Sequence, residues 1–197
     1  MKYLLVLYLI ALPVVLNAQI KDTIYKKRLK TGEVHAVVYI DKDKNSPYYK
    51  RLETRDVIDK HLKDYTDSLK VKYKVEFARN IKVKGLPQKW ISLEKYKGNY
   101  YTYFPCDFCS SNYFIKFSGN MMYWFSSEND VSLIIVAEQV NPKTYQIDTK
   151  SVSSPSRLSK ISVINREKGI AVFEFYNTYL HEKFYKLMVD ATKKARQ

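Results

Sequence analysis

Two cysteines separated by two residues form the pattern with the clearest chemical potential in this chain. Cys106 and Cys109 enclose Asp107-Phe108, and Ser110-Ser111-Asn112 follows them. In a thiol oxidoreductase this spacing lies at a helix N-terminus, where backbone N–H groups lower the pKa of the first thiol. Here the next residues lead directly into a predicted strand and leave no room for that helix. We therefore interpret Cys106 and Cys109 as a structural disulfide and keep a thiol-disulfide oxidoreductase as an alternative.

The histidines and the common catalytic motifs indicate no further site. His35, His61 and His181 are far apart in the sequence, and two cysteines without a nearby histidine do not complete the four ligands of zinc. The pair His181-Glu182 suits acid–base chemistry but is more typical of an exposed turn. The chain has no Gly-x-Ser-x-Gly elbow, no glycine-rich phosphate loop and no His-Glu-x-x-His. We assign no catalytic residue, metal site or cofactor and favour a protein that is not an enzyme, although distant residues can still assemble a site.

Aromatic side chains offer a binding surface instead. The chain contains 18 Tyr, 9 Phe and 2 Trp, and many of them fall between residues 100 and 125. Alternation along a strand sends half of such side chains to each face of a sheet. In a closed sheet the inner set either fills the core or lines a pocket for an apolar ligand. The candidate ligand-binding residues are Tyr100, Phe104, Tyr113, Phe117, Tyr123 and Phe125.

The elements that must position these aromatics are predicted to be short strands. Turn residues such as Ser118-Gly119-Asn120 and Asn141-Pro142 separate the apolar runs. The runs are Tyr100–Phe104, Tyr113–Phe117, Met121–Phe125, Val131–Val140, Tyr145–Thr149, Ile161–Ile164, Ile170–Tyr176 and Phe184–Val189. Their regular spacing indicates an antiparallel up-and-down meander that closes into a barrel, and not alternating βαβ units.

The residues before the meander predict a smaller module of hairpin, helix and strand. Thr23–Leu29 and Val34–Ile40 flank a turn that contains Gly32, which suits a β-hairpin. Apolar residues between Pro47 and Asp67 recur at helical spacing and predict an amphipathic helix. Leu69–Phe77 alternates apolar and charged residues, which predicts a strand with one buried face.

The stretch Ala78–Gln88, with its lysines, glycine and proline, is interpreted as the boundary between two parts. This division gives an N-terminal module of residues 19–85 and a barrel-like domain of residues 86–197. The expected fold class is mainly β, or α+β for the chain as a whole. Low glycine and proline content and abundant aromatics favour such a sheet-rich protein.

The first 18 residues have the composition of a secretory signal. Lys2 precedes an apolar run from Tyr3 to Leu16, and Asn17-Ala18 follows. We expect cleavage after Ala18 and a periplasmic or secreted protein. A retained anchor is disfavoured because Pro13 interrupts the run and the run is shorter than the ~20 residues of a spanning helix.

The net charge of +14 limits the kinds of partner that are expected. The lysines are dispersed, with no block that is typical of a nucleic-acid-binding arm, so no nucleic-acid partner is expected. Solvated faces explain most of this charge, and the alternative is a site for an anionic polymer such as an envelope glycan. The sequence indicates no oligomeric state.

The stretch from Trp90 to Tyr101 resembles the entry to a lipocalin-like (calycin-type) barrel. In that family a short helical turn precedes a first strand bearing Gly-x-Trp; here Gly98 matches the glycine and Tyr100 stands at the tryptophan position. The similarity spans residues 90–190 at most and implies an eight-stranded barrel. In general composition the chain also resembles secreted proteins of Bacteroidetes-like Gram-negative bacteria.

These patterns together predict a non-enzymatic binding protein. The expected ligand is a small apolar or lipid-like molecule in the mouth of the barrel. The alternative is a cell-envelope interaction module whose basic and tyrosine-rich faces bind an anionic glycan or a partner protein. The thiol-disulfide oxidoreductase remains the second alternative.

Overall fold

The computed structural model divides the chain into two compact units, Met1–Thr54 and Arg55–Gln197. The residues that it describes are 21–28, 30–31, 34–41, 43, 45, 58, 60–102, 114–126 and 129–193.

The first unit contains a two-stranded antiparallel hairpin. Strands β1 (Lys21–Arg28) and β2 (Val34–Asp41) pair with Lys21 opposite Asp41, and the register shifts at two points along the ladder. The predicted hairpin is therefore confirmed. Gly32, which was expected to enable its turn, lies outside the described residues.

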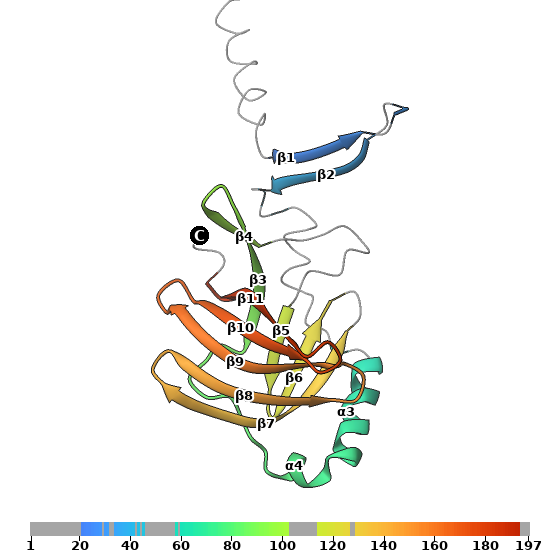
Figure 1. Ribbon diagram of the computed structural model, residues 1–197, viewed down its shortest axis with the longest axis vertical. Helices are drawn as coiled ribbons and strands as arrows, with labels where there is room; N and C mark the ends of the chain where they lie inside the picture. The colour runs from blue at the N-terminus through green and yellow to red at the C-terminus, as the bar shows by residue number, and fades with distance from the viewer. Residues whose placement is uncertain are drawn as a thin grey trace, which may run out of the picture. The chain divides into compact units, whose positions relative to one another are not determined.

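Eight antiparallel strands close into a barrel in the second unit (Figure 1). They are β3 (Lys89–Tyr96), β5 (Phe114–Ser118), β6 (Met121–Phe125), β7 (Asp130–Asn141), β8 (Thr144–Ser151), β9 (Ser156–Asn165), β10 (Ile170–Asn177) and β11 (Glu182–Asp190). Each strand pairs with the next in this order, and β11 pairs back with β3 through Met188 opposite Ser92. The predicted mainly β class and the closed up-and-down meander are confirmed.

The first strand of the barrel differs from the predicted one. The sequence predicts Tyr100–Phe104, but β3 takes that place, and β4 (Asn99–Thr102) pairs only with the second half of β3. The helical turn implied by the lipocalin resemblance at Trp90 is also wrong, because these residues form β3. The reason is burial on both faces: Trp90 belongs to the interior cluster while Ile91 and Leu93 are buried as well, so β3 lacks a clear alternation.

The predicted strand over Leu69–Phe77 is wrong. Helix α3 (Lys60–Lys72) runs through its first half and helix α4 (Lys74–Ala78) through its second. Leu62 and Leu69 are buried, and seven residues apart they lie on the same face of α3, which contacts β7. Burial of this apolar face against the barrel stabilises the helix and outweighs the alternation of the segment. The helix predicted over Pro47–Asp67 is confirmed from Lys60, and most of its earlier part lies outside the described residues.

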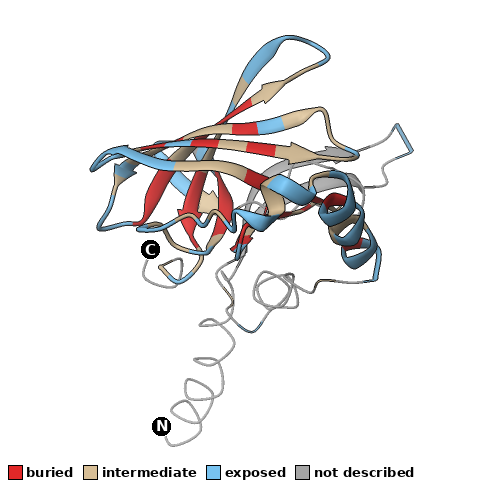
Figure 2. Cartoon of the chain, turned by 90° about the horizontal axis from the view of Figure 1, so that it is seen from below, coloured by how far each residue is buried: buried red, intermediate tan, exposed pale blue. Residues whose placement is uncertain are grey.

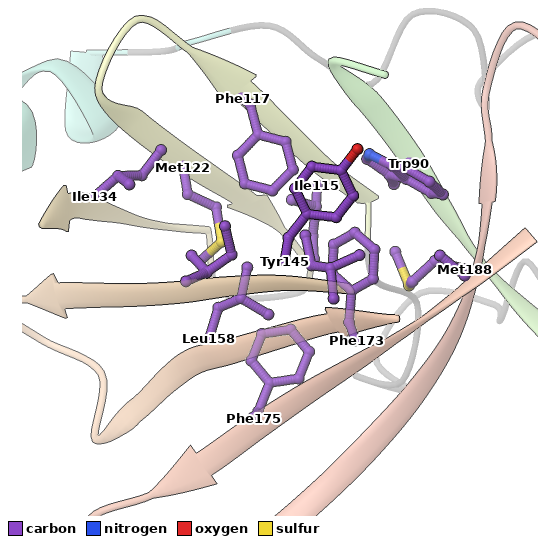
Figure 3. Close-up of a cluster of buried hydrophobic side chains, with 13 residues drawn as sticks. Trp90, Ile115, Phe117, Met122, Ile134, Tyr145, Leu158, Phe173, Phe175 and Met188 are labelled. Atoms are coloured by element: carbon purple, nitrogen blue, oxygen red, sulfur yellow. The ribbon is translucent and has the colours of Figure 1, made fainter. Parts of the chain in front are cut away.

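Buried side chains fill the interior of the barrel (Figure 3). Trp90 packs edge-to-face on Phe173, with ring centroids 5.1 Å apart, and Phe117 stacks on the same ring. The cluster consists of Trp90, Ile115, Phe117, Met122, Ile134, Tyr145, Ile147, Leu158, Ile161, Ala171, Phe173, Phe175 and Met188. Dense packing of this kind stabilises the closed sheet, so the centre of the barrel is a core.

The outer face of strands β5 to β7 is buried too. Alternation places Phe114, Tyr123 and Leu133 on the face opposite the interior cluster, and all three are buried. Helix α3 contacts β7 from outside the barrel, and Figure 2 shows that its other side is exposed. In the described part of the chain, no helix is long and apolar enough to span a bilayer.

Candidate functional site

The predicted ligand-binding aromatics occupy different environments. Tyr100 lies on β4, outside the barrel wall, and is 43% exposed. Phe117 belongs to the interior cluster. Tyr123 and Phe125 are buried outside that cluster, on the opposite face of β6 from Met122, with ring centroids 6.4 Å apart. The four described candidates therefore do not line one common cavity.

The remaining candidates cannot be placed in the fold. Phe104 and Tyr113 lie outside the described residues, as do Cys106 and Cys109, so the disulfide stays a prediction. Of the histidines, His61 packs against Tyr65 on α3, and His181 lies 3.1 Å from the hydroxyl of Tyr176 in an exposed turn. Among the described residues, no group of three or more His, Cys, Asp or Glu side chains is arranged to hold a metal ion.

A groove of about 710 Å³ lies at the end of the barrel where β7 passes into β8. One wall is the coil Asn80–Gly85, part of the connection from α4 to β3, and the other wall comes from the end of β7 and the start of β8. The lining residues are Asn80, Ile81, Lys82, Val83, Lys84, Gly85, Ala137, Gln139, Tyr145 and Ile147. Two of them, Tyr145 and Ile147, also belong to the interior cluster, so the groove reaches the core of the barrel.

Alternating side chains hold the coil against this end of the barrel. Ile81 and Val83 are half-buried and pack on the interior cluster, whereas Lys82 and Lys84 are exposed. Leu86, farther along, packs on the same cluster. Burial of apolar surface is thus the main force that holds the coil in place.

Two hydrogen bonds from core side chains fix the backbone at the end of this coil and just beyond it. The Tyr145 hydroxyl donates to the Gly85 carbonyl at 3.2 Å, and the Trp90 indole N–H donates to the Pro87 carbonyl at 2.8 Å. Figure 3 shows the side chains of Tyr145 and Trp90 with the polar atoms that make these bonds. Gly85 has φ +76°, and a Cβ there would meet the Tyr145 hydroxyl at 3.1 Å. Only glycine fits this position without strain.

Helix α4 is tied to the barrel just before the groove begins. The Lys150 ammonium on β8 donates to the Glu76 carboxylate at 3.0 Å, and the Asn120 amide donates to the Phe77 carbonyl at 3.0 Å. The hydrogen bond from Lys150 holds the pKa of Glu76 below its ordinary value. These contacts set the point from which Asn80–Gly85 crosses the barrel end.

The carboxylate of Glu174, buried on the outer wall of the barrel, has a structural role. Glu174 on β10 accepts from Lys160 and Lys183, each at 2.9 Å, and from the Ser159 hydroxyl at 3.3 Å. The hydrogen bond from Lys160, followed by that from Lys183, lowers the pKa of Glu174. This fully paired carboxylate joins β9, β10 and β11 and faces away from the interior cluster.

The chemistry of the groove suits binding. Its walls offer the apolar side chains of Ile81, Val83 and Ala137, while Lys82, Lys84 and the amides of Asn80 and Gln139 supply the polar part. Sequence reasoning misses this site because Ala78–Gln88, which contains the coil, is typical of a boundary between two parts. The available signal was the alternation Ile81-Lys82-Val83-Lys84 followed by Gly85, which indicates an extended segment with one apolar face.

No protein-family model, no curated protein and no solved structure matches the chain.

Proposed function

We propose that this chain is a non-enzymatic binding protein for a small apolar or lipid-like ligand, held in the groove beside Asn80–Gly85. The observation that carries this proposal is the groove itself, because its lining includes the core residues Tyr145 and Ile147. Concave sites lined by apolar residues with a few polar groups are the usual form of small-ligand sites. The ligand lies at the barrel end because side chains occupy the centre.

We also propose a relationship to the lipocalin-like barrels and a site of action outside the cytoplasm. The closed eight-stranded antiparallel barrel supports the first point at the level of architecture. The second rests on the signal-like residues 1–18, which lie outside the described residues. Mass measurement of the mature protein from the bacterial periplasm or medium is expected to give a chain that begins at Gln19.

The binding proposal is tested by blocking the groove. Gln139 is exposed and lines the groove, so Gln139→Trp places an indole in it without disturbing the core. The probe is N-phenyl-1-naphthylamine, an uncharged fluorophore. We expect saturable binding to the unmodified protein and a loss of about tenfold or more in affinity, roughly 1.4 kcal/mol, in the variant.

The matched control is Gln146→Trp, because Gln146 is also exposed, lies on β8 and does not line the groove. This control should bind the probe as the unmodified protein does. Absence of probe binding to the unmodified protein, or equal binding to both variants, would contradict the proposal.

A second candidate function is contact with an anionic envelope glycan or a partner protein through the β3–β4 hairpin. Tyr100 is exposed there, and the Lys95 ammonium lies 5.8 Å from the centre of its ring. An exposed aromatic ring beside a cation suits sugars that carry acidic groups. Lipopolysaccharide binding that falls with added salt and is weakened by Tyr100→Ala would support this function.

A further inference from the structure

The two lysines of the groove differ from three lysines on the barrel strands, which form ion pairs with glutamates. Lys150 is paired with Glu76, and Lys160 and Lys183 are paired with Glu174. Lys82 and Lys84 line the groove and, among the described residues, have no carboxylate within ion-pair distance. None of the described residues that line the groove is acidic. The groove therefore carries two positive charges that the described part of the protein does not neutralise.

The alternation of apolar and lysine side chains along the coil sets where these charges lie. Ile81 and Val83 face the interior cluster, so the lysines that alternate with them stand at the solvent side. Ile81 and Ala137 give the same groove an apolar inner lining, and the buried Ile147 and Tyr145 lie behind it. Apolar surface at the inner end and positive charge at the outer end match a molecule with a hydrocarbon tail and a negatively charged head.

We propose that the groove selects amphiphiles with an anionic headgroup, a carboxylate or a phosphate, over neutral ones of the same chain length. This inference rests on the proposed binding function and specifies the ligand class of the same site. Lys82 and Lys84 meet the charged head, while the amides of Gln139 and Asn80 complete its hydrogen bonds. Because both lysines are exposed, the attraction is screened by salt and supplies selectivity more than total affinity.

The test compares two probes of equal chain length, dodecanoate and 1-dodecanol, below the concentration at which dodecanoate forms micelles. Each probe is measured by its displacement of N-phenyl-1-naphthylamine from the purified protein. The variant is Lys82→Ala with Lys84→Ala, because truncation removes the charge and keeps the extended coil. We expect dodecanoate to bind about tenfold more tightly than dodecanol, and this advantage to disappear in the variant.

Two controls separate the groove from the general positive field of the protein. Lys72→Ala with Lys74→Ala removes two exposed charges at the same spacing from α3 and α4, outside the groove lining, and should leave dodecanoate binding within about twofold. Lys82→Arg with Lys84→Arg keeps the charge and should retain the preference. Added salt should weaken dodecanoate binding and leave dodecanol binding unchanged.

The outcomes distinguish this inference from the function on which it rests. If both probes bind with equal affinity and the lysine variants change neither, the headgroup inference is wrong while the binding function stands. An equal loss in the Lys72/Lys74 control would also overturn it, since the selectivity would then come from net charge. If neither probe displaces the fluorophore and the fluorophore itself does not bind, both proposals fail.

Discussion

Leu69–Phe77 and Ile81–Gly85 share an alternation of lysines and apolar residues, yet they fold differently. The first segment is helical in α3 and α4 and leaves Val71 and Val75 82% and 69% exposed. The second segment contains no helix or strand, and its Ile81 and Val83 pack on the core of the barrel. The same local pattern thus buries its apolar side chains in one place and exposes them in the other.

The difference shows that an alternation of apolar and charged residues sets the conformation of a segment only where an apolar surface is available to bury one face. The coil Asn80–Gly85 meets the open end of the barrel, where the interior cluster accepts Ile81 and Val83. The preceding segment begins in α3, which contacts the outside of β7 and buries Leu62 and Leu69 at helical spacing. Burial of those two leucines prevails over the alternation of the lysines and valines around them.

The largest expected effect comes from the buried anchor of the helical segment. Leu69→Ala should lower the free energy of unfolding by about 2–4 kcal/mol, because Leu69 is fully buried against the barrel unit. Val71→Ala, its matched control two residues along, should change it by less than about 0.5 kcal/mol because Val71 is exposed. Urea unfolding measures both. Equal losses would indicate that Leu69 and Val71 share one buried face, as in a strand.

A smaller effect is expected at the glycine that ends the coil segment. Gly85→Ala should lower the free energy of unfolding by roughly 2 kcal/mol, because the added Cβ combines a positive φ with crowding of the Tyr145 hydroxyl. Gly98→Ala is the control: its φ is +82° but a Cβ there meets nothing within 4 Å, so it should cost roughly 1 kcal/mol. If thermal or urea unfolding gives equal costs, the contact between Gly85 and Tyr145 contributes nothing to holding the coil.

The smallest effect concerns the ion pair between α4 and β8. Lys150 lowers the pKa of Glu76 from its ordinary value of 4.5, so the folded state binds this proton less readily than the unfolded chain. The stabilisation is therefore complete above about pH 4.5 and is lost as the pH falls through the lower pKa of the folded protein. Glu76→Gln should destabilise modestly at pH 7, less than Gly85→Ala does.

The measurement is the difference in urea midpoint between the unmodified protein and Glu76→Gln from pH 7 to pH 3. This difference should shrink below pH 4.5, because the carboxyl of the unmodified protein then becomes neutral as well. A difference that stays constant across this range would show that the ion pair does not fix α4.

Much of the barrel could be predicted because its signals are local. Gly119, with φ +61°, lies in the turn between β5 and β6 that Ser118-Gly119-Asn120 predicts. The strand β3 could not be recognised in the same way, because burial on both faces removes the alternation from Trp90 to Leu93. None of the four described ligand candidates lines the groove, since that site is made by a coil that resembles a linker in sequence.

The sequence by itself determined the mainly β class, the hairpin of the first unit and most strands of the barrel. Turn residues and alternating side chains act over a few neighbouring positions, so their effect is visible without the rest of the chain. Only the tertiary structure decided that β3 closes the barrel, that Leu69–Phe77 is helical and that Asn80–Gly85 forms a groove with β7 and β8. The first depends on burial of both faces of β3, and the other two depend on an apolar surface that exists only once the barrel has closed.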